Sequence, residues 1–147
     1  MQNSVWAHAN IWLLAAATLS IIGAALHVAI IFGGPAWYRS FGAGEQMALA
    51  AARGSPMPAL LTAAIAIVLL VWAAYALAAA GLMLRLPLMA VALIAITAVL
   101  TVRGGLIFVP NWWRQDLSAD FKFWSSLFVL AMALCYGIGT WQRWDRL

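Results

Sequence analysis

Four long apolar runs constrain this chain more than any other feature of its sequence. They cover residues 11–32, 59–83, 88–109 and 123–141, and each is close to the roughly 20 residues that a helix needs to cross about 30 Å of hydrocarbon. Of all residues, 67% are hydrophobic and only 8% are charged, too few polar groups to cover the surface of a water-soluble domain. The pattern predicts an all-α integral membrane protein, a single domain over residues 1–147 with four transmembrane helices in a bundle.

The connection between the first two runs is the longest one. The first run ends at Gly33, Gly34 and Pro35, which do not continue a helix easily. Residues 44–52 then read GEQMALAAA, a stretch of strong helix formers. We therefore expect a short interfacial helix between transmembrane helices 1 and 2. Only residues 84–87 separate the second run from the third, so we expect those two helices to form a tight antiparallel hairpin.

The charges and tryptophans gather at the ends of the apolar runs. The formal net charge is +4, and most of the nine tryptophans fall near helix ends, as in the aromatic belts of bilayer proteins. This distribution indicates interfacial anchoring and argues against a nucleic-acid partner. Four spans place both termini on one face, here called the terminus side, and both long connections on the other, the loop side. Basic residues occur on both, so the positive-inside rule does not decide the orientation.

Several kinds of chemistry are excluded by residue counts and spacing. Cys135 is the only cysteine, so an internal disulfide or a cysteine metal cluster cannot form. His8 and His27 lie on one predicted helix about 28 Å apart and cannot ligate one haem iron. The sequence has no metal-ligand spacing, no phosphate-binding loop and no nucleophile motif. We expect no metal and no cofactor.

Ionisable groups inside membrane spans are costly and therefore mark candidate functional sites. His27 lies about six residues before the end of its span, roughly 9 Å below the loop-side interface, and Arg103 lies at a similar depth in the third span. Together with polar and aromatic residues of the long connection and of the start of the fourth span, they predict one polar layer near the loop side. The predicted ligand-binding residues are His27, Tyr38, Glu45, Arg103, Trp124 and Ser126.

Two interpretations of His27 follow from its helix face. It shares that face with Ser20, Gly23 and Ala24, a stripe of small residues that favours close packing against other helices. We therefore expect His27 to point into the bundle. There it is either a structural histidine that bonds a neighbouring hydroxyl or carbonyl group, or a group that contacts a ligand or carries a proton.

Arg103 and Glu45 also allow more than one interpretation. The Arg103 side chain either extends to the lipid head groups, or forms a buried pair with Glu45 or Asp116, or binds an anion or a lipid head group. Glu45 begins the predicted short helix, where the helix dipole alone favours a carboxylate. A site role for Glu45 is the alternative.

The leading functional hypothesis is a membrane protein that binds an amphipathic small molecule or lipid in a pocket open to the loop side. Polar groups at one depth beside aromatic residues are typical of such pockets. Three alternatives stay open: an accessory or scaffold subunit, homo-oligomeric or not, that packs through its alanine and glycine faces; a membrane-embedded enzyme with His27 as acid or base and Glu45 orienting it; and a small dimeric transporter. The expected partners are membrane lipids.

Four sequence segments resemble an uncharacterised group of small bacterial inner-membrane proteins with four helices. The segments are GPAWYRSFGAGEQMA, GSPMPALLTAAIA, the LPL of the second turn and the RGG of the third span. The resemblance covers most of the chain. It implies the four-helix fold and a multi-pass location in the bacterial inner (plasma) membrane, but no activity, ligand or catalytic residue.

Overall fold

The protein is all-helical and crosses the membrane four times, in a computed structural model that describes residues 9–109 and 117–147. Four helices are long and apolar enough to span a membrane, the third of them together with the 3-10 turn that follows it. A short helix lies between the first two long ones, so the predicted interfacial helix is present. The helices are α1 (Ile11–Ser40), α2 (Glu45–Ala52), α3 (Met57–Ala80), α4 (Met89–Gly105) and α5 (Ala119–Gln142), with 3-10 turns η2 (Leu106–Phe108) and η3 (Trp144–Arg146).

Capping residues move the helix ends away from the ends of the apolar runs. The Ser118 side chain accepts a hydrogen bond from the Phe121 amide at 3.2 Å, so α5 begins four residues before the predicted span. Asn10 caps α1 in the same way, by accepting from the Leu13 amide at 3.0 Å. Gly81, with a left-handed φ of 91°, ends α3, as glycine does at many helix C-termini.

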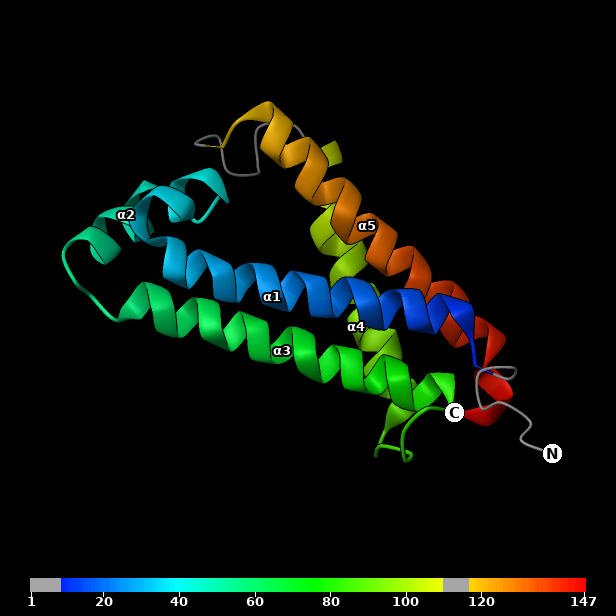
Figure 1. The fold of residues 1–147 in the computed structure, drawn as a ribbon. Coiled ribbons are helices and arrows are strands. Elements are labelled where there is room, and N and C mark those ends of the chain that lie inside the picture. Colours follow the sequence, from blue (N-terminus) through cyan, green and yellow to red (C-terminus); the bar gives the residue numbers. More distant parts are fainter. Residues whose placement is uncertain (1–8, 110–116) are drawn as a thin grey trace.

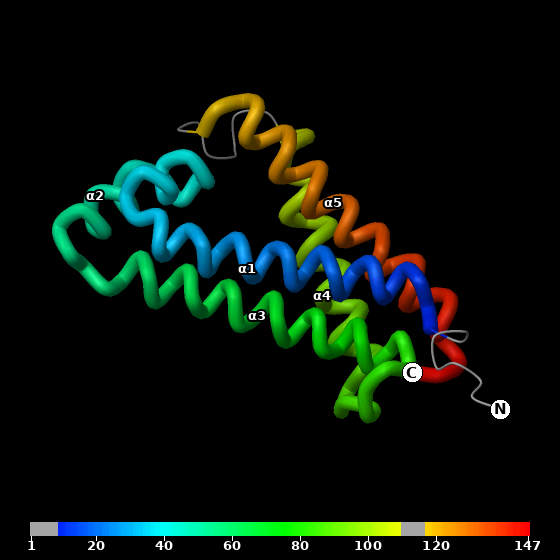
Figure 2. The backbone as a smooth tube through the Cα atoms, viewed as in Figure 1, coloured from blue at the N-terminus to red at the C-terminus, as the bar shows by residue number. Residues whose placement is uncertain are grey.

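A sharp bend divides α1 near the loop side. Gly34 has φ 65° and ψ −154°, and Pro35 follows it, so the helix breaks where the sequence predicted its end and then resumes for about one and a half turns. The Trp37 ring lies over Gly33 in the space that a Cβ there would occupy. The segment after the bend consequently turns back beside the body of α1, as the cyan part of the tube shows (Figure 2).

The long helices pack as two pairs. The most extensive contacts join α1 to α3 and α4 to α5, and α1 also crosses α5 (Figure 1). The predicted tight hairpin of the second and third spans is wrong, because α3 and α4 contact each other little. Each has its main partner elsewhere, and the connection 81–88 is long enough to let the two helices separate. An open groove between them is lined by Val71, Trp72, Tyr75, Ala92, Ala95, Ile96 and Val99.

Small residues let the helices approach closely, as is common in membranes. A Cβ on Gly104 of α4 would lie 2.6 Å from Leu130 Cγ of α5. A Cβ on Gly139 of α5 would lie 2.6 Å from Leu13 Cγ of α1. The predicted stripe on α1 is buried as expected, and its members are Ser20, Gly23 and Ala24.

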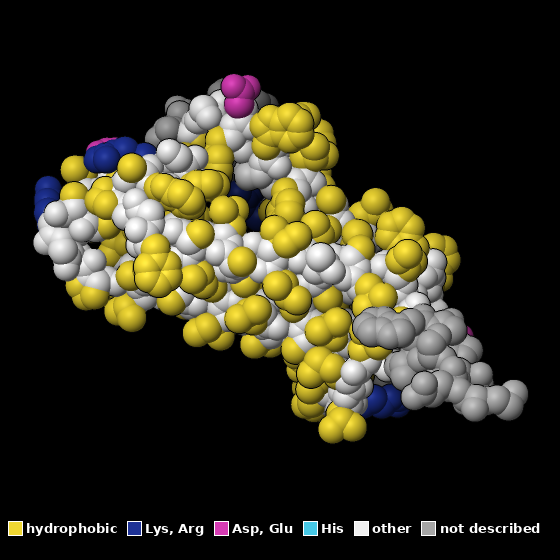
Figure 3. Space-filling model, viewed as in Figure 1, with side chains coloured by type: hydrophobic (Ala, Val, Ile, Leu, Met, Phe, Trp, Pro, Cys, Tyr) yellow, Lys and Arg dark blue, Asp and Glu magenta, His cyan; other side chains and the backbone are white. Residues whose placement is uncertain are grey.

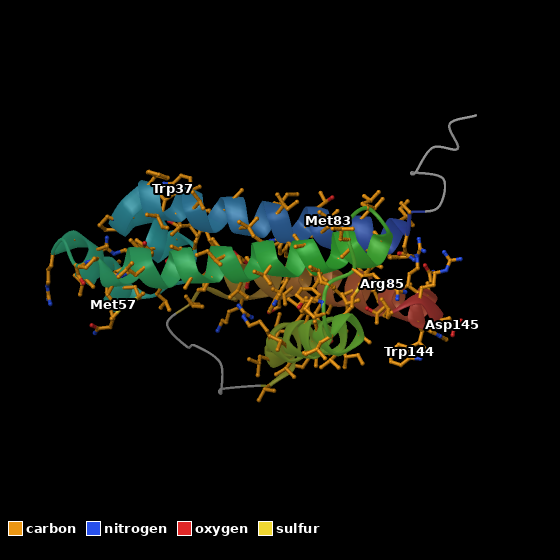
Figure 4. All side chains as sticks on the ribbon, turned by 90° about the horizontal axis from the view of Figure 1, so that it is seen from below. Trp37, Met57, Met83, Arg85, Trp144 and Asp145 are labelled. Carbon is orange, nitrogen blue, oxygen red and sulfur yellow. The ribbon has the colours of Figure 1, made fainter. Side chains whose placement is uncertain are left out.

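The terminus side is held together by hydrogen bonds between elements. Figure 4 shows Arg85 of the 81–88 connection near Trp144 and Asp145, at the opposite end of the molecule from Trp37 and Met57. Three side-chain hydrogen bonds hold the chain ends to each other and to the end of α3 and the 81–88 connection that follows it. They join Asn10 Nδ2 to Gln142 Oε1 at 2.8 Å, Arg143 to the Ala80 carbonyl at 3.3 Å, and Arg85 to the Arg146 carbonyl.

A buried hydrogen bond joins α1 to α5 inside the bundle. The Ser20 and Tyr136 hydroxyl oxygens are 2.9 Å apart, and both residues are fully buried. We expect Ser20→Ala and Tyr136→Phe to couple by about 0.6 to 2 kcal/mol in a double-mutant cycle, the range found for hydrogen bonds between membrane helices. The measurement is the unfolding free energy in detergent. Thr18→Ala paired with Tyr136→Phe is the control, because Thr18 bonds its own helix; equal coupling in both cycles would contradict the assignment.

The outer surface of the spans is apolar. Figure 3 shows hydrophobic side chains over most of this face, with charged groups near its ends. Large apolar side chains such as Ile67, Val91 and Leu134 are more than half exposed. In a membrane these side chains contact lipid rather than water, which agrees with the multi-pass architecture.

Candidate functional site

The candidate site is a hollow between the loop-side halves of α1 and α5, called here the loop-side hollow. The two helices touch through the Ser20–Tyr136 hydrogen bond in their terminus-side halves and, near the middle of the span, at Gly23, whose Cβ position lies 3.9 Å from the Phe128 ring. Beyond that level they diverge (Figure 1). Figure 3 shows the resulting hollow between the bent end of α1 and the start of α5, with a basic side chain visible in its depth.

His27 lies on α1 one turn beyond Gly23, where α1 and α5 begin to diverge. It is on the same face of α1 as Gly23 and is partly buried. Its Nδ1 lies 2.7 Å from the Gly23 carbonyl oxygen. Because a carbonyl only accepts, Nδ1 carries a proton and Nε2 of the neutral ring is an acceptor. The structural interpretation of His27 thus explains the hydrogen bond of Nδ1. The ligand interpretation concerns Nε2 and stays a prediction.

Arg103 lies in the loop-side part of α4. It is partly buried in the last turn of that helix, and its neighbour Gly104 packs against Leu130 of α5. Leu130 is two residues from Phe128, the residue of α5 that lies opposite Gly23. This packing places the Arg103 turn of α4 near the level of Leu130 and Gly23 of α1 near the level of Phe128, about 3 Å apart along α5. His27 lies one turn farther toward the loop side.

Glu45 pairs with Arg39 and not with Arg103 or His27. The Arg39 guanidinium donates to both carboxylate oxygens, at 2.7 and 2.9 Å, across the turn from α1 to α2. This hydrogen bonding lowers the pKa of Glu45. The stabilisation from the pair is therefore present at neutral pH and is lost only as the pH falls through that lowered pKa. The sequence did not identify Arg39 as the partner, because the pair depends on the tight turn at residues 41–44, where Gly42 and Gly44 both have positive φ.

The other three predicted residues lie in different surroundings. Tyr38 is buried against Ile30 and Ala48, and its hydroxyl has no hydrogen-bond partner among the described residues. Ser126 is fully buried within α5. Trp124 is 66% exposed and contacts Phe123 edge to face with ring centroids 5.4 Å apart. Trp124 thus sits on the outer surface, as an interfacial anchor does.

No family model, curated protein or solved structure matches the chain. The site is therefore interpreted from its own geometry and chemistry. Predictions that involve His8, Trp112, Trp113 and Asp116 lie outside the described residues.

Phe121 is a residue of the site that the sequence did not single out. It lies in the first turn of α5, and its ring occupies the space that a Cβ on Gly42 would need. This contact joins the α1–α2 turn to α5 at the outer rim of the loop-side hollow. The glycines of the FGAG turn indicate that another part of the chain can approach closely there. They do not indicate that this part is Phe121.

A second groove lies on the terminus side between α4 and α5. Its volume is about 410 Å³, and Trp141, which is 81% exposed, stands at its edge. None of its lining residues is charged, so it offers less to a polar head group than the loop-side hollow does. The lining residues are Ile94, Thr97, Ala98, Gly137, Thr140, Trp141 and Trp144.

Proposed function

We propose that this protein binds an amphipathic lipid with an anionic head group in the loop-side hollow. The observation that carries the proposal is the divergence of α1 and α5 around a hollow with a basic side chain in its depth (Figure 3). A basic side chain within a membrane span attracts anionic groups, and a guanidinium is well suited to them. It binds phosphate or carboxylate oxygens through two parallel hydrogen bonds. The lipid chain would extend between the apolar faces of α1 and α5.

The chemistry of His27 narrows the class of head group. With Nδ1 bonded to the Gly23 carbonyl, the neutral ring presents Nε2 as an acceptor for a hydroxyl donor. In this proposal Arg103, in the last turn of α4, supplies the positive charge. A phosphate that carries a free hydroxyl group, as in a glycerol phosphate head, matches both groups.

The alternatives have less support from the contacts. The small residues that suggested a scaffold subunit are largely used inside this one chain, where Gly23, Gly104 and Gly139 face other helices of the same bundle. An enzyme with Glu45 orienting His27 would need the carboxylate to leave Arg39, which binds both of its oxygens. We also propose that the membrane is the bacterial inner membrane, which the sequence resemblance alone supports.

Thermal unfolding in a mild detergent tests the proposal. We expect phosphatidylglycerol to raise the midpoint and phosphatidylcholine to leave it nearly unchanged. A ligand at 100 times its Kd stabilises the folded state by about 2.7 kcal/mol, which corresponds to a rise of several degrees for a domain of this size. Glycerol phosphate without acyl chains is the third arm, and a full effect from it would point to a free phosphate compound as the ligand. Equal effects of both lipids would contradict the proposal.

A further inference from the structure

Residues 35–53 form a distinct unit bounded by two glycine bends. Gly34 has φ +65° and Gly54 has φ +75°, values that glycine adopts without steric cost. No described side chain lies within 4 Å of the Cβ position of either glycine. A methyl group at either bend would therefore lie in open space.

The unit between these bends holds itself together. The two-pronged Arg39–Glu45 pair joins its first arm, the end of α1, to its second arm, α2. Tyr38 packs on Ala48 of α2, in a cluster separate from the main core, and it also packs on Ile30, which precedes the bend in the body of α1. The segment is thus suited to move as one body.

In addition to its contacts with α1 and α3, this unit meets α5 at the rim of the loop-side hollow. The Phe121 ring of α5 lies against Gly42 and fills the space of its missing Cβ. The terminus side is different, because hydrogen bonds such as Asn10 to Gln142 fix its elements together. The terminus side is therefore held by polar contacts between elements, whereas at the rim of the hollow the described contact with α5 is apolar.

The closed position also leaves a polar group without a partner. The Tyr38 hydroxyl is buried, and no described residue bonds it. A buried hydroxyl without a hydrogen bond raises the free energy of the state that buries it. Movement of the unit that exposes this hydroxyl to water or to a head group would remove the penalty.

We propose that residues 35–53 are a lid that swings about Gly34 and Gly54 and closes on Phe121 through Gly42. In the open position the lid admits a lipid head group to the loop-side hollow, and in the closed position it retains it. The inference rests on the proposed function, because the hollow beneath the lid is the proposed binding site. It adds that entry and release are controlled by the Gly42–Phe121 contact.

Distances between two spin labels test the lid directly. The labels are attached in a Cys135→Ser background at Ala52→Cys in the lid and Leu127→Cys on α5, both exposed positions, in phosphatidylcholine nanodiscs. We expect Phe121→Ala, which removes the contact, and Gly42→Ala, whose Cβ overlaps the ring, to raise the long-distance population several-fold. Gly81→Ala is the matched control, since Gly81 also has a positive φ, of +91°, but no described side chain near its Cβ position. A distribution that responds to neither variant, or equally to the control, overturns the lid.

Phosphatidylglycerol separates the two proposals. Its addition is expected to raise the short-distance population of the wild-type protein, and Phe121→Ala is expected to speed its dissociation several-fold. If the variants shift the distances but phosphatidylglycerol gives no thermal stabilisation, the proposed function fails and the lid stands. If phosphatidylglycerol stabilises the protein but the distances respond neither to it nor to the variants, the lid fails and the binding site stands.

Discussion

Replacing Gly104 by alanine is expected to destabilise the protein by about 1 to 3 kcal/mol, the usual cost of overfilling a packed interface. The new Cβ would lie 2.6 Å from Leu130 Cγ and 3.2 Å from the Leu130 backbone nitrogen. The side-chain atoms can rotate away, but the backbone nitrogen belongs to the middle of α5 and cannot. The helices α4 and α5 must therefore move apart along their main line of contact.

The neighbouring glycine provides a matched control for this change. No described side chain lies within 4 Å of a Cβ on Gly105, so Gly105→Ala adds a methyl group to open space. It should be neutral or stabilising by up to about 1 kcal/mol, because alanine is the better helix former. The unfolding free energy of both variants in the same detergent decides the matter. Equal losses would show that the α4–α5 packing at Gly104 is not as close as described.

The number and order of the helices could be predicted from the sequence because each depends on local properties. Run length fixed the four spans, and GEQMALAAA indicated α2, which the structure places at Glu45–Ala52. The pairing of helices could not be predicted in the same way. Chain connectivity favoured a hairpin of α3 and α4, but the close approaches at Gly104 and Gly139 decide which helices pack. Glycine and alanine on several faces do not indicate in advance which partner each face meets.

The sequence indicates on which side of the membrane the candidate site lies. It indicates less well which individual residues form the site. Depth along a helix follows from residue counting, so His27 and Arg103 were assigned to one layer. Rotation and partner choice need the three-dimensional contacts. Glu45 binds Arg39 because the chain turns sharply at residues 41–44, and Trp124 faces outward at the surface of α5. Neither outcome has a signal in the spacing of polar residues.

Removing the Arg103 side chain is expected to abolish most of the stabilisation by phosphatidylglycerol. Loss of a buried, hydrogen-bonded charge contact commonly costs 2 to 5 kcal/mol, so Arg103→Ala should weaken Kd by roughly 100-fold, at 1.4 kcal/mol per factor of ten. At a lipid concentration of 100 times the wild-type Kd, the increase in unfolding free energy that the lipid causes, called here the lipid increment, would then fall from about 2.7 to about 0.4 kcal/mol. His27→Ala should reduce it in the same direction by removing the second contact.

Controls at other arginines show whether this loss is specific to the loop-side hollow. Arg53 is an exposed cation on the loop side, and Arg53→Ala should leave the lipid increment unchanged. Arg85 donates to the Arg146 carbonyl on the terminus side, so Arg85→Ala should lower the midpoint without lipid but keep the increment. If the increment survives Arg103→Ala and His27→Ala and disappears with Arg85→Ala, the ligand binds at the terminus side. The apolar groove between α4 and α5 would then be the place to search for it.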